Sequence, residues 1–141
     1  MQLVVEHARQ REDSTARRLA EAERQEALAA GQLRQLESYR ADYANGRYGA
    51  PGGTVQGRRL VQTQHFLANV ERALGDLRRR TAALATRTDE SRKALQTARA
   101  RRQALEALSQ RYQLELERQA RRQEQRLSDE HAARRSPLQL P

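Results

Sequence analysis

Apolar residues recur every three or four positions along two long stretches of the chain, and a glycine-rich segment separates them. The first stretch, residues 3–44, lacks proline and is rich in Ala, Leu, Glu, Gln and Arg, which are strong helix formers. The second stretch, residues 58–134, has the same character. This spacing places one apolar line along each helix and is typical of coiled coils. The sequence therefore predicts two long helices, of which the second is the longer.

These apolar lines, or seams, consist mainly of small side chains. The first seam is Val5, Ala8, Thr15, Leu19, Ala22, Ala29, Leu33, Leu36 and Tyr43, with interruptions at Glu12, Glu26 and Arg40. The second seam is Leu60, Thr63, Leu67, Val70, Leu74, Leu77, Thr81, Leu84, Thr88, Ser91, Leu95, Ala98, Leu105, Tyr112 and Leu116, with breaks at Arg102 and Ser109. Small residues let helices approach closely but bury little apolar area, so we expect pairing of moderate stability.

Residues 45–57, NGRYGAPGGTVQG, interrupt the helical pattern. Asn45-Gly46 favours a turn, and Pro51 followed by two glycines does not continue a helix. We therefore predict an all-α fold, an antiparallel coiled-coil hairpin. We expect a single coiled-coil domain over 1–141, with helix 1 at about 3–44, the tip loop at about 45–57, helix 2 at about 58–134 and a disordered tail at 135–141. Helix 1 pairs only as far as about Arg102, so the rest of helix 2 stays exposed, frays or docks on another protein.

Composition agrees with a long, thin molecule. Of 141 residues, 37% are apolar and 32% are charged, which is too little apolar surface for a thick globular core. Disorder is the competing class for so polar a chain, and the regular leucine spacing argues against it. The longest apolar run, Ala27 to Ala30, cannot span a membrane, and the first residues lack the pattern of a secretory signal. We expect a soluble, cytoplasmic protein.

The net charge of +9 is carried almost entirely by arginine, and residues 76–141 hold 16 basic and 9 acidic groups. Basic clusters occur at 78–80, 99–102 and 118–126. Each is either a solvated helix face or a contact with an acidic partner. A nucleic-acid interface is less well supported, because no basic-region motif occurs and no aromatic residues alternate with the arginines.

No catalytic or cofactor-binding pattern occurs in the sequence. There is no phosphate-binding loop, the glycines do not form a dinucleotide-binding pattern, and the chain has no cysteine. His7, His65 and His131 lie more than fifty residues apart, so none has a second ligand at helical metal-binding spacing. We expect neither an enzyme nor a site for a cofactor or metal.

Aromatic residues gather where the two helices should meet. Tyr39, Tyr43 and Phe66 flank the glycine-rich break. Two helices give little room to bury three rings, so the rings either pack on each other across the hairpin or form an exposed anchor for a partner. The residues alone leave both possibilities open.

The stretch around the break resembles a known family. Leu33, Leu36, Tyr39 and Tyr43, then a glycine-containing loop, then Gln64, Phe66, Leu67, Glu71, Ala73 and Leu74 are similar to the FliJ family of the bacterial flagellar type III export apparatus. The tail, with Arg-Arg-Gln-Glu-Gln before Asp129 and Glu130, resembles the family as well. The resemblance covers nearly the whole chain, and its specific part is about forty residues around the break.

The resemblance implies a stalk-like coiled coil that acts in flagellum biogenesis, and through it in motility and chemotaxis. The implied partners are the flagellar export ATPase, the cytoplasmic domain of the export gate and the export chaperones, without membrane insertion but with peripheral association at the inner membrane. The implied gate contact falls on Gln32, Leu36, Tyr39, Tyr43, Phe66, Val70 and Ala73. Val70 departs from the leucine usual there, and Leu77 stands where a polar residue can occur. We expect the exposed end of helix 2, with Arg118, Arg121, Arg122 and Arg126, to enter the ATPase ring.

Two other functions remain open. The chain could be the equivalent stalk of a virulence-type secretion system, which shares the architecture. It could also be a generic basic coiled-coil scaffold that binds nucleic acid, whose binding would weaken steeply with salt. That second alternative gives no reason for the aromatic residues.

Overall fold

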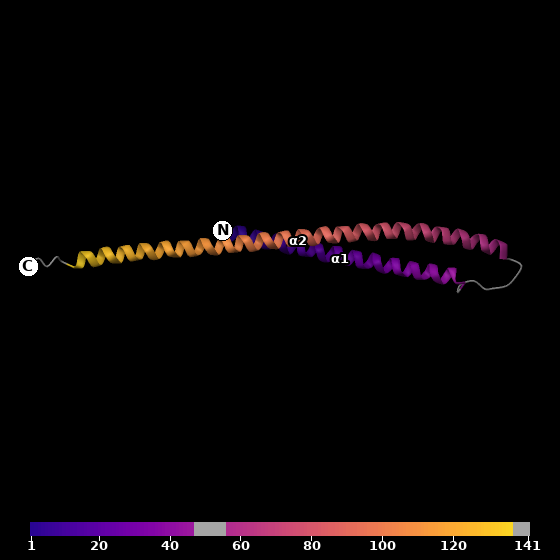
Figure 1. Cartoon of the computed structure of the whole chain (residues 1–141), viewed down its shortest axis with the longest axis horizontal. Helices are drawn as coiled ribbons and strands as arrows, with labels where there is room; N and C mark the ends of the chain where they lie inside the picture. Colours follow the sequence, from indigo (N-terminus) through magenta and orange to yellow (C-terminus); the bar gives the residue numbers. More distant parts are fainter. Residues whose placement is uncertain (47–55, 137–141) are drawn as a thin grey trace, which may run out of the picture. The chain divides into compact units, whose positions relative to one another are not determined.

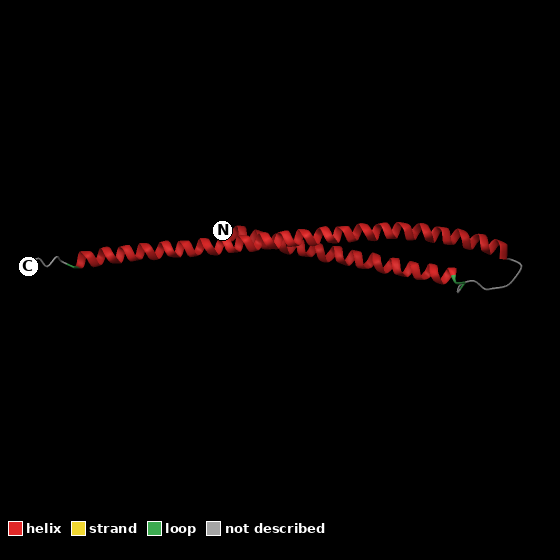
Figure 2. Cartoon of the chain, in the orientation of Figure 1, coloured by secondary structure: helices red, strands yellow, loops and turns green. Residues whose placement is uncertain are grey.

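Two long helices account for the described structure. The computed structural model describes residues 1–46 and 56–136. Within them, α1 spans Gln2–Ala44 and α2 spans Gln56–Arg135 (Figure 1). Figure 2 shows helix and loop but no strand in this part of the chain. The predicted all-α fold with a longer second helix is confirmed, whereas the single-domain organisation stays a prediction.

Helix α1 ends at Ala44, and the Asn45-Gly46 pair that follows forms the predicted turn. Residues Asn45 and Gly46 form a turn, and the Gly46 N–H donates to the carbonyl oxygen of Tyr43 at 3.2 Å. Gly46 has φ of 74°, a left-handed conformation that side chains disfavour and glycine adopts readily. The remainder of the predicted tip loop, 47–55, and residues 137–141 of the predicted tail lie outside the described residues.

The chain divides into two compact units, each of which contains parts of both helices. One unit comprises residues 13–96, and the other comprises residues 1–12 with 97–141. In the unit 13–96 the buried side chains are Ala22, Ala29, Val70, Leu74, Thr88 and Leu95. All six belong to the predicted seams. Leu60, also predicted for the seam, is exposed.

The buried hydroxyl in this seam is satisfied within its own helix. Thr88 is 2% exposed, and its Oγ1 donates to the carbonyl oxygen of Leu84 at 3.0 Å. Thr81 makes the same bond to Leu77 at 2.8 Å. No buried side-chain nitrogen or oxygen in the described part of the chain lacks a hydrogen-bond partner. The polar seam residues therefore avoid the desolvation cost of an unsatisfied group.

The other unit has a shorter seam. Val5 and Ala8 are buried, but every residue from Gln110 to Ser136 is exposed. Tyr112 and Leu116 continue the predicted seam but are 54% and 47% exposed. This agrees with the expectation that helix 2 stays exposed beyond the reach of helix 1.

Ion pairs between the helices show that they run antiparallel in each unit. In the unit 13–96, Arg92 pairs with Glu23 at 3.5 Å, Arg78 pairs with Glu37 at 3.3 Å, and Arg40 pairs with Glu71. The residue numbers of the partners on α1 therefore increase as the residue numbers of the partners on α2 decrease, as expected for antiparallel helices. In the other unit, Arg9 pairs with Glu106 at 2.9 Å, and Glu12 pairs with Arg102 and Arg99.

Candidate interaction surfaces

The three aromatic rings near the end of α1 form one cluster. The ring centroids of Tyr43 and Phe66 lie 4.4 Å apart, and those of Tyr39 and Phe66 lie 5.9 Å apart at 73°, an edge-to-face contact. Tyr39 and Tyr43 are 6.5 Å apart. Such pairs add about 0.5–1.5 kcal/mol each beyond the burial of their surface. We call Tyr39, Tyr43 and Phe66 the tip cluster.

The tip cluster combines both possibilities that the sequence leaves open. The rings pack on one another across the hairpin, and Tyr43 and Phe66 are half-buried. Tyr39 is still 43% exposed. An aromatic side chain held in place by its neighbours and presented to solvent is suited to anchor a protein partner.

The other residues predicted for the gate contact divide into two groups. Gln32 and Ala73 are exposed, so a partner can reach them. Val70 is 7% exposed and Leu36 is half-buried, because both lie in the seam. The structure therefore brings Tyr39, Gln32 and Ala73 to the surface, while Val70 packs in the core.

The four arginines predicted for the ATPase contact lie on the exposed part of α2. Arg118, Arg122 and Arg126 follow one another at four-residue spacing, and Arg121 lies beside them on the helix surface. Like charges four residues apart destabilise a helix by about 0.2–0.5 kcal/mol per pair. The Nε of Arg121 donates to the carbonyl oxygen of Glu117 at 3.4 Å. This line of charge is available to an acidic partner.

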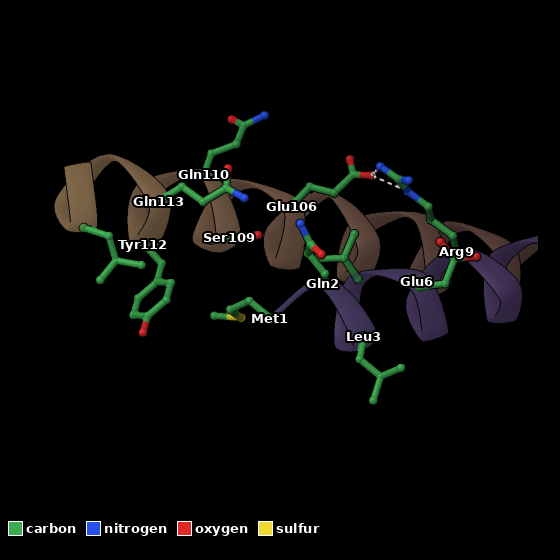
Figure 3. A pocket seen from close by; sticks show the side chains of 12 residues that line it. Met1, Gln2, Leu3, Glu6, Arg9, Glu106, Ser109, Gln110, Tyr112 and Gln113 are labelled. Atoms are coloured by element: carbon green, nitrogen blue, oxygen red, sulfur yellow. Dashed lines mark hydrogen bonds and ion pairs between the residues drawn. The ribbon is translucent and has the colours of Figure 1, made fainter.

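A shallow groove lies where α1 begins. Figure 3 shows that side chains from the start of α1 and from α2 line it together, including Met1, Leu3 and Tyr112. Leu116 also lines the groove. The only carboxylates among its lining residues are Glu6 and Glu106, and Glu106 is already bound to Arg9. The groove is therefore an apolar surface with a charged rim rather than a site for acid–base chemistry.

Two of the residues that interrupt the seams, one from each helix, contact each other. Glu12 breaks the first seam and Arg102 the second, and their side chains, 16% and 24% exposed, form an ion pair. Arg102 also reaches Glu106 at 2.6 Å, and this carboxylate accepts a hydrogen bond from Arg9 at 3.0 Å. The hydrogen bond from Arg9, aided by Arg102 and opposed by burial, holds the pKa of Glu106 below its usual value. The hydrogen bond to Glu12 raises the pKa of Arg102.

Metal ligands do not cluster in the described part of the chain: no group of three or more His, Cys, Asp or Glu there could hold a metal ion. Neither α1 nor α2, over the residues described, contains an apolar stretch that could span a lipid bilayer.

Sequence reasoning missed one feature of these surfaces. The interhelical ion pairs use Glu71, Arg78, Arg92, Arg99 and Glu106 of α2. Each follows directly after a seam residue, at a heptad position that flanks the contact line. Their spacing by multiples of seven is visible in the sequence and would have predicted a single salt-bridged edge.

An antiparallel hairpin of two long helices, with an exposed aromatic side chain at the tip cluster and an exposed basic end of α2, defines a coiled-coil protein. The family model of the flagellar FliJ protein matches residues 1–139. The chain belongs to the FliJ family, and with it to flagellar type III protein export. No curated protein matches the chain closely enough to count as a relative.

Proposed function

We propose that this chain is a non-enzymatic stalk that couples the flagellar export ATPase to the membrane export gate. The observation that carries the proposal is the tip cluster, in which Tyr43 and Phe66 hold a 43% exposed Tyr39 at one end of a hairpin of the FliJ family. A rigid aromatic anchor is a common energetic centre of protein interfaces.

The export gate's cytoplasmic domain binds the tip surface in this proposal. Tyr39 supplies the apolar anchor, and Gln32 and Ala73 border it. Tyr43 and Phe66 contribute mainly by holding Tyr39, since they are half-buried. Leu36 and Val70 act through the seam beneath, so their substitution changes the surface indirectly.

The export ATPase binds the other surface, at Arg118, Arg121, Arg122 and Arg126. These side chains lie on exposed helix with no buried residue between Gln110 and Ser136. Guanidinium groups bind carboxylates with two parallel hydrogen bonds, so acidic residues lining an ATPase ring are suitable partners. The mechanism is mechanical and regulatory, and no reaction takes place on the chain itself.

The proposal includes the wider role of the stalk. The protein is cytoplasmic, associates peripherally with the inner membrane at the flagellar base, folds as a single coiled-coil domain and helps to recycle export chaperones. The equivalent stalk of a virulence-type secretion system has the same architecture, and the match to the flagellar family favours the flagellar system.

The experiment is a binding assay with the purified export ATPase and the cytoplasmic domain of the export gate. We expect Tyr39→Ala/Gln32→Ala to lose the gate and keep the ATPase. The variant with Gln at all four of Arg118, Arg121, Arg122 and Arg126 should do the reverse. Removing an aromatic hot spot weakens an interface by about 2 kcal/mol or more, roughly thirtyfold in Kd.

The control variant removes an apolar side chain from a part of the helix away from the tip surface. Leu28→Ala removes a 59% exposed apolar side chain from α1 outside the tip surface and should change neither interaction. Helix content by circular dichroism confirms that each variant folds. If the wild type binds neither partner, or if Leu28→Ala weakens the gate as much as the tip variant does, the proposed coupling role is wrong.

A further inference from the structure

The two edges of the helix pair differ sharply in charge. On one edge, α1 and α2 exchange ion pairs, as in Glu23–Arg92 and Glu37–Arg78. The other edge is formed by the residues that immediately precede the first seam residue of each heptad. In the unit 13–96 we call these residues the open edge: Arg18, Gln25, Gln32, Tyr39, Phe66, Ala73, Arg80, Arg87 and Ala94.

The structure shows that this second set of positions does face across the helix pair. Tyr39 of α1 and Phe66 of α2 both belong to the open edge, and their rings are in contact at 5.9 Å. Farther along, Arg87 of α2 helps to lower the pKa of Glu21 on α1, although hydrogen bonds from Arg24 and Gln25 dominate that shift. The open edge is therefore a continuous strip that begins at the tip cluster.

The open edge carries three arginines and no acidic residue. Arg18, Arg80 and Arg87 make no hydrogen bond or ion pair with any other residue that the structure describes, and all three are exposed. Their neighbours behave differently, because Arg78 pairs with Glu37 and Arg79 pairs with Asp76. The structure thus separates the cluster 78–80 into two satisfied cations and one unpaired cation, Arg80.

The geometry points to an acidic helix of a protein partner as the occupant of the open edge, and we propose that its carboxylates recur at seven-residue intervals. Arg80 and Arg87 lie seven residues apart, about 10 Å along α2, which matches one heptad of a third helix laid along the edge. Ala73 and Ala94 leave space for a close backbone approach. Arginine forks bind carboxylates with two parallel hydrogen bonds, which favours a protein with ordered Glu or Asp residues.

Other occupants fit these observations less well. A second copy of the chain carries the same net charge of +9 and no acidic residue on its own open edge, so two copies repel each other there. For nucleic acid, bases would need aromatic side chains among the arginines for stacking. The aromatic residues of the open edge, Tyr39 and Phe66, lie at its tip end, where Gln25, Gln32 and Ala73 separate them from the arginines. The three arginines of the open edge lie outside Arg118–Arg126 and outside the proposed gate contact, which shares only the tip end of the edge (Gln32, Tyr39, Phe66 and Ala73), so the inference does not depend on the proposed ATPase or gate contact.

The test uses the full chain and a designed, fluorescently labelled helical peptide about four heptads long. The peptide has glutamate at every seventh position on an Ala/Gln background, and a second peptide of equal composition spreads the glutamates around the helix. The edge variant is Arg18→Gln/Arg80→Gln/Arg87→Gln. The matched control, Arg17→Gln/Arg72→Gln/Arg79→Gln, removes the same charge from exposed residues that each directly precede an open-edge residue, namely Arg18, Ala73 and Arg80.

We expect the wild type to bind the in-register peptide about tenfold more tightly than the scrambled one, since several charge pairs of about 0.5 kcal/mol each add up. The edge variant should lose this preference, and the control variant should keep it. Arg and Gln have similar helix propensities, so both variants should keep the wild-type helix content and melting temperature.

Three results would overturn the inference. The first is equal affinity of the wild type for the two peptides, and the second is equal loss in the edge and control variants. The third comes from parallel titrations with a short DNA duplex and with vesicles of phosphatidylserine and phosphatidylcholine. If the edge variant weakens binding to either of those and leaves peptide binding intact, the open edge is a nucleic-acid or membrane surface instead.

Discussion

The two compact units differ in how α2 is stabilised. In residues 13–96, both helices contribute buried side chains, and Leu74 is completely inaccessible to solvent. Among the residues of the other unit that the structure describes, only Val5 and Ala8 are buried hydrophobic residues, and α2 is exposed from Gln110 to Ser136. The first region is held by packing between helices, whereas the far end of α2 relies on helix propensity and local hydrogen bonds.

The two regions therefore differ in how much of the surface of α2 a partner can reach. A helix that packs on a neighbour has one face committed to the core, and only its edges and back can meet a partner. The exposed end of α2 has no committed face, so Arg118 and Arg126 are accessible from any direction. Regions with few buried apolar contacts open at low free energy, which suits a segment that adapts to a partner.

The largest expected effect comes from the core of the packed region. Leu74→Ala removes a side chain with 0% exposure and should lower the free energy of unfolding by about 3 kcal/mol, because it loses both burial and packing. Leu116→Ala at the exposed end should change it by less than about 0.5 kcal/mol. Urea denaturation followed by circular dichroism measures both. Similar losses in the two variants would mean that the end of α2 is packed in solution.

The second effect concerns the ion pair in the seam. Arg102→Leu removes the nearer of the two arginines that pair with the Glu12 carboxylate, which is 16% exposed, and leaves only Arg99 at 3.3 Å. It should therefore lower the melting temperature clearly. The double variant Glu12→Leu/Arg102→Leu replaces the pair by apolar side chains and should restore or exceed wild-type stability. If both variants melt at the same lower temperature, the positions require polar groups for another reason. The single variant Arg101→Leu, next to this pair and exposed, is the control.

A smaller effect is the pH dependence in the same network. The pKa of Glu106 is lowered in the folded protein, chiefly by the Arg9 hydrogen bond. A lowered folded-state pKa adds stability that is present above the unfolded pKa and disappears as the pH falls through the folded pKa. Glu106→Gln should therefore melt below the wild type at neutral pH, and the difference should vanish in acid. A difference in melting temperature that stays constant as the pH falls from neutral to strongly acidic would contradict this linkage.

The sequence predicted the packed region well because its signal is local. The heptad positions of Ala22, Ala29, Val70 and Leu95 follow from apolar spacing, and all four are buried. The same spacing continues through Tyr112 and Leu116, which are exposed. Periodicity within one helix does not show how far the other helix reaches, and it was the difference in length between the two helical stretches that predicted this exposure. The pairing of Glu12 with Arg102 could not be predicted either, because in the sequence each residue is a single polar interruption of its own seam.

Interaction surfaces were only partly predictable. Tyr39, Tyr43 and Phe66 stood out by composition, yet the sequence did not tell that Tyr43 and Phe66 support an exposed Tyr39. The basic clusters looked alike along the chain. Only the ion pairs distinguish Arg78 and Arg79 from Arg80, because charge balance on a helix edge depends on the residues of the other helix.

The smallest effect tests whether the middle of α1 behaves as ordinary exposed helix. A Cβ added at Gly31 meets nothing within 4 Å, so Gly31→Ala should stabilise the protein by up to about 1 kcal/mol through helix propensity alone. Gly46 is the contrasting control: its φ of 74° strains any side chain, so Gly46→Ala should destabilise by about 1 kcal/mol. Thermal denaturation of the two variants beside the wild type decides the matter. Destabilisation by Gly31→Ala would show that the position contacts another molecule or bends the helix. The middle of α1 would then belong to the adaptable part of the protein and not to its packed part.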